Sequence, residues 1–142
     1  MEPTLPERGE IKGFASVVFP ARDLGAGVTA WRALLAQEPA FVGEDFAVFS
    51  GGGVEIGLAA LPWVDEPLVF WTVDDIEAAQ RALVARGATA LAETTDGSLA
   101  ELGTAAVANG DPATGIVDVA GGRLAVVRAP DGNLLGLTQE TR

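Results

Sequence analysis

The chain has 142 residues, 49% of them hydrophobic, and a formal net charge of −11. This length and composition predict one globular domain with a core of its own, and such an acidic chain excludes a nucleic acid as partner because it repels phosphate groups. The sequence contains no cysteine and no histidine, which excludes disulfides, thiolate metal sites and catalytic sites of the Ser-His-Asp and Cys-His types.

The beginning of the chain, with two prolines and mixed charges, predicts a loose tail over residues 1–10. It lacks the basic and apolar regions of a secretory signal, and no apolar stretch further along is long enough to cross a bilayer. We therefore expect a cytoplasmic protein without a membrane partner.

The next segment has the pattern of a strand, a helix and a hairpin. Residues 14–21 are rich in Val and Phe, which favours a strand, and Asp23 then stands where a helix N-cap belongs. Two short strands are predicted over 45–50 and 54–59. The glycines at 51–53 permit the backbone angles of a hairpin turn between them.

The same order returns in the second part of the chain. Residues 67–73 predict a strand, Asp74 or Asp75 caps the helix that follows, and Gly87 ends this helix. A short strand is then predicted over 88–92.

The last part of the sequence has the weakest signals. Residues 94–122 are mostly small, polar or glycine, and they predict either a functional loop or local structure that the pattern does not define. A final hairpin is predicted over 123–138, because Pro-Asp-Gly within 129–133 has the residues of a tight turn.

The two halves therefore repeat one arrangement of strand, helix and three strands. Asp23 matches Asp75, and segment 47–58 is similar to segment 125–137. We predict an α+β fold in which two βαβββ modules, residues 11–66 and 67–139, form one curved mixed sheet with a cleft. Because each module leaves a sheet face uncovered, we also expect a homodimer.

Three motifs in this order carry a resemblance to a known family. They are a strand, Arg-Asp-Leu and a helix over 16–35, Val-Asp-Asp-Ile-Glu-Ala-Ala at 73–79, and Ala-Pro-Asp-Gly-Asn-Leu-Leu-Gly-Leu at 129–137. Over residues 11–139 the chain resembles the vicinal-oxygen-chelate superfamily, which includes glyoxalase I, the extradiol dioxygenases and the bleomycin-resistance proteins. The resemblance implies the glyoxalase/bleomycin resistance/dioxygenase fold.

Metal-dependent members of this superfamily are similar to one another at four inward positions, which carry His, Glu, His and Glu or close variants. The resemblance maps these positions onto Ser16, Gly57, Leu68 and Gly136. None of these residues is a metal ligand. The resemblance therefore implies a member without a metal, and so without metal-assisted isomerisation or dioxygenation.

One further motif bears on cofactors. The segment Gly25-Ala-Gly-Val-Thr-Ala30 matches the dinucleotide fingerprint G-x-G-x-x-A. Asp23 stands where a pyrophosphate would approach and would repel it, and a hairpin over 45–59 does not fit the parallel strands of a Rossmann unit. We therefore predict no cofactor.

Strand alternation around the four mapped positions predicts a mostly apolar cleft with a few polar groups, which is the usual composition of a small-molecule site. Together with Trp63 from the loop between the modules, the predicted ligand-binding residues are Ser16, Val18, Glu55, Gly57, Trp63, Leu68, Phe70, Thr72, Leu134 and Gly136.

Two of these residues have specific chemistry. Glu55 is the one acid that the pattern places in the cleft, where it would capture a ligand cation or act as a general base. Its alternative interpretation is a solvated carboxylate near a hairpin turn. Trp63 would cover the cleft and stack on a flat ligand, or else pack at a dimer interface.

The leading hypothesis is a metal-independent protein that binds a small cationic or aromatic molecule, similar to the bleomycin-resistance proteins that sequester drugs. The alternative is an enzyme of the same superfamily, a lyase, isomerase or dioxygenase, that uses a metal through other residues or none and has Glu55 as its candidate base. A third hypothesis is a degenerate module that dimerises with another protein.

Overall fold

The computed structural model of the protein describes residues 11–51, 54–119 and 121–140. The predicted tail over 1–10 and the glycines 52 and 53 of the first hairpin lie outside these ranges. The elements in chain order are β1 (Ile11–Pro20), α1 (Leu24–Leu35), β2 (Phe41–Val42), β3 (Phe46–Gly51), β4 (Val54–Ala59), β5 (Leu68–Val73), α2 (Ile76–Ala85), β6 (Thr89–Glu93), β7 (Leu99–Glu101), β8 (Val117–Val119), β9 (Gly122–Arg128) and β10 (Leu134–Glu140). In the described part of the chain, no helix is long and apolar enough to cross a membrane.

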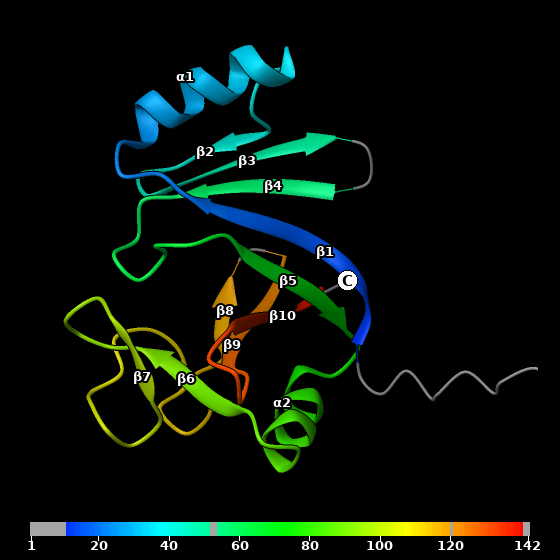
Figure 1. Cartoon of the computed structure of the whole chain (residues 1–142), viewed down its shortest axis with the longest axis vertical. Helices are drawn as coiled ribbons and strands as arrows, with labels where there is room; N and C mark the ends of the chain where they lie inside the picture. The colour runs from blue at the N-terminus through cyan, green and yellow to red at the C-terminus, as the bar shows by residue number, and fades with distance from the viewer. Residues whose placement is uncertain (1–10, 52–53, 120, 141–142) are drawn as a thin grey trace, which may run out of the picture.

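The strands form one mixed sheet with the order β2-β3-β4-β1-β5-β10-β9-β6-β7, and β8 pairs with β9. At its centre β1 and β5 run antiparallel, with Ser16 opposite Phe70 and Val18 opposite Leu68. β1 also pairs in parallel with β4, and β5 with β10. Each half of the chain thus supplies one side of the sheet (Figure 1). The predicted α+β fold is confirmed, with β7 and β8 added to the second βαβββ arrangement.

Both helices begin at equivalent aspartates, as the repeat predicts. Asp23 Oδ1 accepts a hydrogen bond from Ala26 N at 3.0 Å before α1, and Asp75 Oδ1 accepts one from Ala78 N at 3.1 Å before α2. These carboxylates satisfy N–H groups of the first turn, which have no partner within the helix. Asp75, rather than Asp74, is therefore the cap of the second helix.

Both helices cover the outer face of the sheet. The apolar side of α1 packs in a cluster with Phe49 and Leu58, and that of α2 packs through Ile76 in a cluster with Leu137. Because alternate residues of a strand point to opposite faces, the inner face carries a third apolar cluster, which includes Phe70. Neither helix belongs to this third cluster, so the inner face is available for a binding site.

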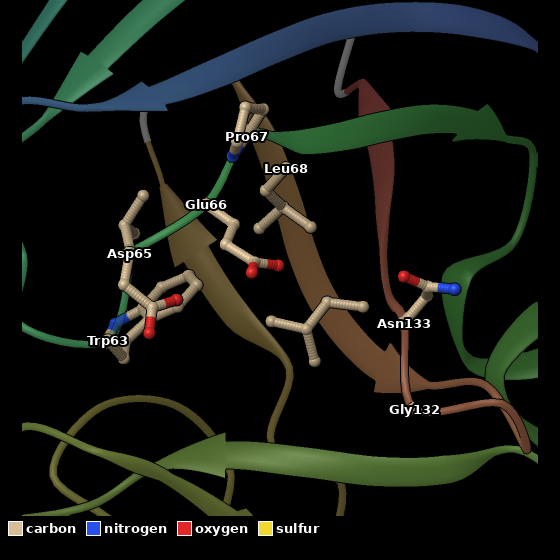
Figure 2. A pocket seen from close by; sticks show the side chains of 9 residues that line it. Trp63, Asp65, Glu66, Pro67, Leu68, Gly132 and Asn133 are labelled. Atoms are coloured by element: carbon tan, nitrogen blue, oxygen red, sulfur yellow. The ribbon is translucent and has the colours of Figure 1, made fainter.

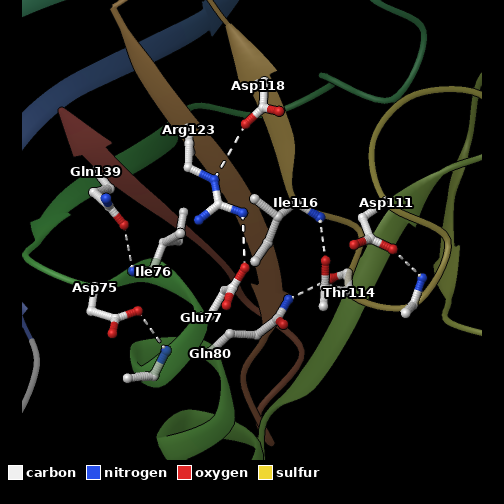
Figure 3. Close-up of polar contacts among 12 residues, drawn as sticks. Asp75, Ile76, Glu77, Gln80, Asp111, Thr114, Ile116, Asp118, Arg123 and Gln139 are labelled. Atoms are coloured by element: carbon white, nitrogen blue, oxygen red, sulfur yellow. Dashed lines mark hydrogen bonds and ion pairs between the residues drawn. The ribbon is translucent and has the colours of Figure 1, made fainter. Parts of the chain in front are cut away.

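Within the second module, polar contacts join α2 to the segment before β8 and to strands β9 and β10 (Figure 3). Gln80, which is 5% exposed, donates from Nε2 to the backbone oxygen of Thr114 at 2.6 Å, and Gln139 Oε1 accepts from Ile76 N at 2.8 Å. Arg123 forms ion pairs with one acid on α2 and one on β8, at 3.0 and 3.3 Å. The segment between β7 and β8 is therefore tied to α2 at Thr114.

The structure differs from the sequence prediction in its shortest strands. β2 has no predicted counterpart, and β7 and β8 lie inside segment 94–122, where the pattern left the local structure open. Each consists of two or three residues and pairs with a longer neighbour, β3, β6 or β9. Two or three residues are too few to show an alternating pattern. The partner strand therefore decides their strand conformation.

Two glycines on the inner face lie beneath side chains of neighbouring strands. Gly57 on β4 is opposite Val18 on β1, and Gly136 on β10 is opposite Phe70 on β5, so the two pairs occupy equivalent places in the modules. A Cβ atom at Gly136 would lie 2.5 Å from Cδ1 of Phe70, whereas one at Gly57 would lie 3.1 Å from Cε2 of Phe46. The Phe70 ring in its present position therefore requires a glycine at 136.

We expect Gly136→Ala to lower the free energy of unfolding by about 1–3 kcal/mol, because the added methyl group displaces the Phe70 ring. Gly57→Ala is the matched control and should cost less. Chemical denaturation measures both values. In the double variant Gly136→Ala/Phe70→Leu the smaller side chain should recover part of the loss, and strictly additive losses would contradict the close contact.

The turn between β6 and β7 is organised around one carboxylate. Asp96 Oδ1 accepts hydrogen bonds from Ser98 Oγ at 2.6 Å, from Thr94 Oγ1 at 2.5 Å and from Ser98 N at 3.0 Å. These bonds, the one from the Ser98 side chain first, lower the pKa of Asp96 from 3.8 to about 2. The ionised carboxylate therefore favours the folded turn.

Because its pKa is lowered in the folded chain, Asp96 contributes stability above pH 3.8, and this contribution is lost as the pH falls toward 2. Asp96→Asn should reduce the stability near neutral pH and make it fall less steeply in this acidic range. Thermal unfolding at a series of pH values measures both effects. Parallel curves for the variant and the wild type would contradict the role of this carboxylate.

Candidate functional site

A cavity of about 1150 Å³ opens on the inner face of the sheet and is lined by both modules of one chain. This volume accommodates a drug-sized molecule. Its walls come from strands of both modules, among them β1, β3, β5 and β9, and from the linker between β4 and β5. Of the residues predicted to bind a ligand, those that line it are Ser16, Val18, Glu55, Gly57, Trp63, Leu68, Phe70 and Thr72.

The other two predicted residues, Leu134 and Gly136, are not among the residues that line this cavity. The Phe70 ring lies over Gly136. Leu134, at the start of β10, instead lines a smaller pocket of about 90 Å³. In that pocket, shown in Figure 2, linker residues such as Glu66 lie on one side and Asn133 on the other. Alternation along β10 therefore does not by itself give a side chain access to the cavity.

The positions that the resemblance maps as metal positions hold no suitable donors. Leu68 is 3% exposed within the inner apolar cluster, Phe70 covers Gly136, and the Phe46 ring lies against Gly57. Among the described residues, no group of three or more acids could hold a metal ion. At three of the four positions apolar contacts thus replace carboxylate and imidazole ligands, and Ser16 offers only a hydroxyl group. The residues present do not fit the metal that the superfamily's metal-dependent members use.

The charged side chains that line the cavity are all acidic. They are Asp45, Glu55, Glu93 and Glu140, and neither lysine nor arginine occurs among the described lining residues. The ion pairs formed between described residues involve other acids, so no basic side chain there neutralises these carboxylates. Negative groups in a concave surface focus a field that attracts cations and repels anions.

One of these acids is held by hydrogen bonds from distant parts of the chain. Glu93, at the end of β6, accepts from Trp63 Nε1 on Oε2 at 2.6 Å and from Asn109 Nδ2 on Oε1 at 2.5 Å. Trp63 and Asn109 also line the cavity. The linker tryptophan is therefore fixed against the second module at the cavity wall.

Glu55 is arranged differently. It lies on β4, opposite Ser16 on β1 and Ser50 on β3, and it is exposed. Within the described ranges, no hydrogen bond or ion pair holds its carboxylate. This position is compatible with attraction of a cation, but no described residue orients Glu55 as a general base, which must be positioned toward the proton that it removes.

Sequence reasoning missed Glu93, Asn109 and Phe46 as residues of the cleft. The strand predicted over 88–92 stops one residue before Glu93, and alternation continued from Leu91 would have found it. Asn109 lies in the segment between β7 and β8, which has no periodic pattern. No local signal in the sequence marks it.

No family model matches the chain, and no curated protein sequence matches it. Solved structures do match it. Methylmalonyl-CoA epimerase from Mycobacterium tuberculosis superimposes with a TM-score of 0.62 at 16% identity, over 97% of this chain and 94% of that one. The Mn(II)-bound glyoxalase from Novosphingobium aromaticivorans gives a TM-score of 0.58 at 18% identity, over 92% of this chain and 39% of that one.

A glyoxalase/bleomycin resistance protein/dioxygenase superfamily member from Vibrio splendidus 12B01 gives a TM-score of 0.54 at 18% identity, over 89% of this chain and 97% of that one. Identities this low establish the fold and not the reaction, because one fold carries many chemistries. With its two modules joined at β1 and β5, the chain has the fold of the vicinal-oxygen-chelate superfamily, as its three motifs predict.

Proposed function

We propose that the protein binds a small molecule with an aromatic body and a cationic group, and that it does so in the inner cleft without a metal. One observation carries this proposal: the cavity is mostly apolar, and its charged side chains are the acids Asp45, Glu55, Glu93 and Glu140, with no basic residue among the described lining residues. This composition supports a ligand-sequestering role like that of the bleomycin-resistance proteins.

The apolar part of such a ligand would bind through contact with aromatic rings. Phe46, Phe70 and Trp63 all line the cavity. Large flat side chains bury much apolar surface for little loss of rotamer freedom, and they contact flat ligands by stacking or edge-to-face packing. An aromatic or polycyclic body is therefore favoured over a small polar metabolite.

The charge of the ligand follows from the acids. An anion would lose its hydration in this cleft and gain no basic partner, which costs several kcal/mol, whereas a cation gains a carboxylate partner. Phosphates, simple carboxylates and CoA thioesters are thus poor candidates. The CoA thioester in the name of the epimerase does not carry over to this chain on structural likeness.

Three fluorescent probes that share a dansyl group test this proposal. Dansylcadaverine ends in an ammonium group, its N-acetyl derivative is neutral, and dansyl-aminocaproic acid ends in a carboxylate. We expect dansylcadaverine to bind about tenfold more tightly than the neutral probe, because a hydrogen bond between charged groups contributes about 1.5–3 kcal/mol. The acid should bind most weakly. Dansyl emission and tryptophan quenching report binding.

A chelator serves as the control for the metal-independent part of the proposal and should leave these affinities unchanged. The proposal fails if none of the probes binds, or if the carboxylate probe binds best. Conversion of a bound molecule into product would favour the enzyme hypothesis.

We also propose that the protein forms a homodimer. The edge strand β2 carries the side chains of Phe41 and Val42, which are 57% and 52% exposed. Edge strands with exposed apolar side chains are prone to contacts between copies. Native mass spectrometry should show a wild-type dimer that Phe41→Lys weakens, and a monomer at micromolar concentrations would contradict this proposal.

A further inference from the structure

We infer that Glu93 is the residue that recognises the cationic group of the ligand, and that Trp63 and Asn109 are positioning residues that hold its carboxylate toward the cavity. This inference rests on the proposed function and deepens it, because it assigns charge recognition to one of the acids in the cleft. It also specifies a ligand cation that can donate a hydrogen bond, such as a primary ammonium group.

Three separate segments of the chain converge on the carboxylate of Glu93. Trp63 comes from the linker between the modules, Glu93 from the end of β6 and Asn109 from the segment after β7. Their side chains meet through two short hydrogen bonds, of 2.6 and 2.5 Å, at the wall of the large cavity. The carboxylate is thus oriented before any ligand arrives.

The carboxylate of Glu93 can accept further hydrogen bonds beyond these two. An ionised carboxylate can accept about four hydrogen bonds, two on each oxygen. Trp63 uses one position on Oε2, and Asn109 uses one on Oε1. Each oxygen of Glu93 therefore retains a lone pair for a further donor, and an ammonium group supplies up to three donors.

Glu93 has no counter-ion among the residues that the structure describes. Glu93 is partly buried and lies next to Ala92 and near Leu91 in the sequence, each 3% exposed. Its hydrogen-bond donors are uncharged, and the ion pairs between described residues do not include it. A neutral acceptor would satisfy the Trp63 indole at a lower desolvation cost, so a carboxylate here is better explained by a cationic ligand.

The other acids of the cleft are not held by hydrogen bonds in this way. Asp45, Glu55 and Glu140 are exposed, and no hydrogen bond from a described residue holds their side chains. Each would lose side-chain freedom on binding a ligand, whereas Glu93 is already ordered by its two donors. A cation beside Glu93 would also lie near the Trp63 ring, whose face attracts positive charge.

The experiment compares the affinities of dansylcadaverine and its N-acetyl derivative for the full chain and its variants. Glu93→Gln should reduce the affinity for dansylcadaverine about tenfold and change that for the neutral probe less than about twofold. Glu44→Gln is the matched control: it removes the same charge from an exposed residue outside the cavity and should change neither affinity.

Trp63→Phe provides a second route in case Glu93→Gln folds poorly. It keeps an aromatic ring and removes the N–H donor, so it should lower the preference for the ammonium probe while the neutral probe still binds. A merely structural role of Trp63 would weaken both probes alike and leave their ratio unchanged.

The outcomes separate this inference from the proposed function. If no probe binds the wild type, the proposed function fails. If the wild type prefers the ammonium probe and Glu93→Gln retains that preference, the proposed function stands and the role of Glu93 is wrong. Loss of the preference in Glu55→Gln instead would assign charge recognition to Glu55 and overturn the inference.

Discussion

The antiparallel pairing of β1 with β5 is the constraint on which the rest of the structure depends. It joins two modules that each supply one side of the sheet, and it places Ser16 opposite Phe70 and Val18 opposite Leu68. Both helices pack on the outer face, so the inner apolar cluster lies on the side that they leave uncovered. A cleft between the modules follows from this arrangement, because the two sides of a curved sheet face each other across its inner surface.

The repeat determines which residues pack against one another on the inner face of the sheet. Equivalent positions of the two modules carry Gly57 beneath Val18 and Gly136 beneath Phe70. Where the resemblance maps metal ligands, this chain has close packing between strands, and the Phe70 ring takes the space that a side chain at position 136 would need. The apolar contacts that replace metal donors also make the cleft suited to an aromatic ligand.

In the proposed function, charge gives this apolar surface its selectivity. The acids around the cavity repel anionic ligands and attract cations over some distance, but long-range attraction alone does not orient a bound molecule. Orientation requires a fixed partner, and Glu93 has one donor on each oxygen, from Trp63 and Asn109. The linker between the modules thus takes part in the site through Trp63, as well as connecting the two halves.

The sequence by itself determined the repeat, the helix cap Asp23, a second cap at Asp74 or Asp75, the longer strands and the α+β fold, because these depend on local periodicity and on side chains that bond to their own backbone. Most of the residues that it predicted for the cleft do line the cavity, since alternation decides the face of a strand. Only the tertiary structure decided that Phe70 covers Gly136 and that Trp63 and Asn109 meet at Glu93. These contacts join residues far apart in the chain, and a local pattern holds no information about which distant side chain fills a given space.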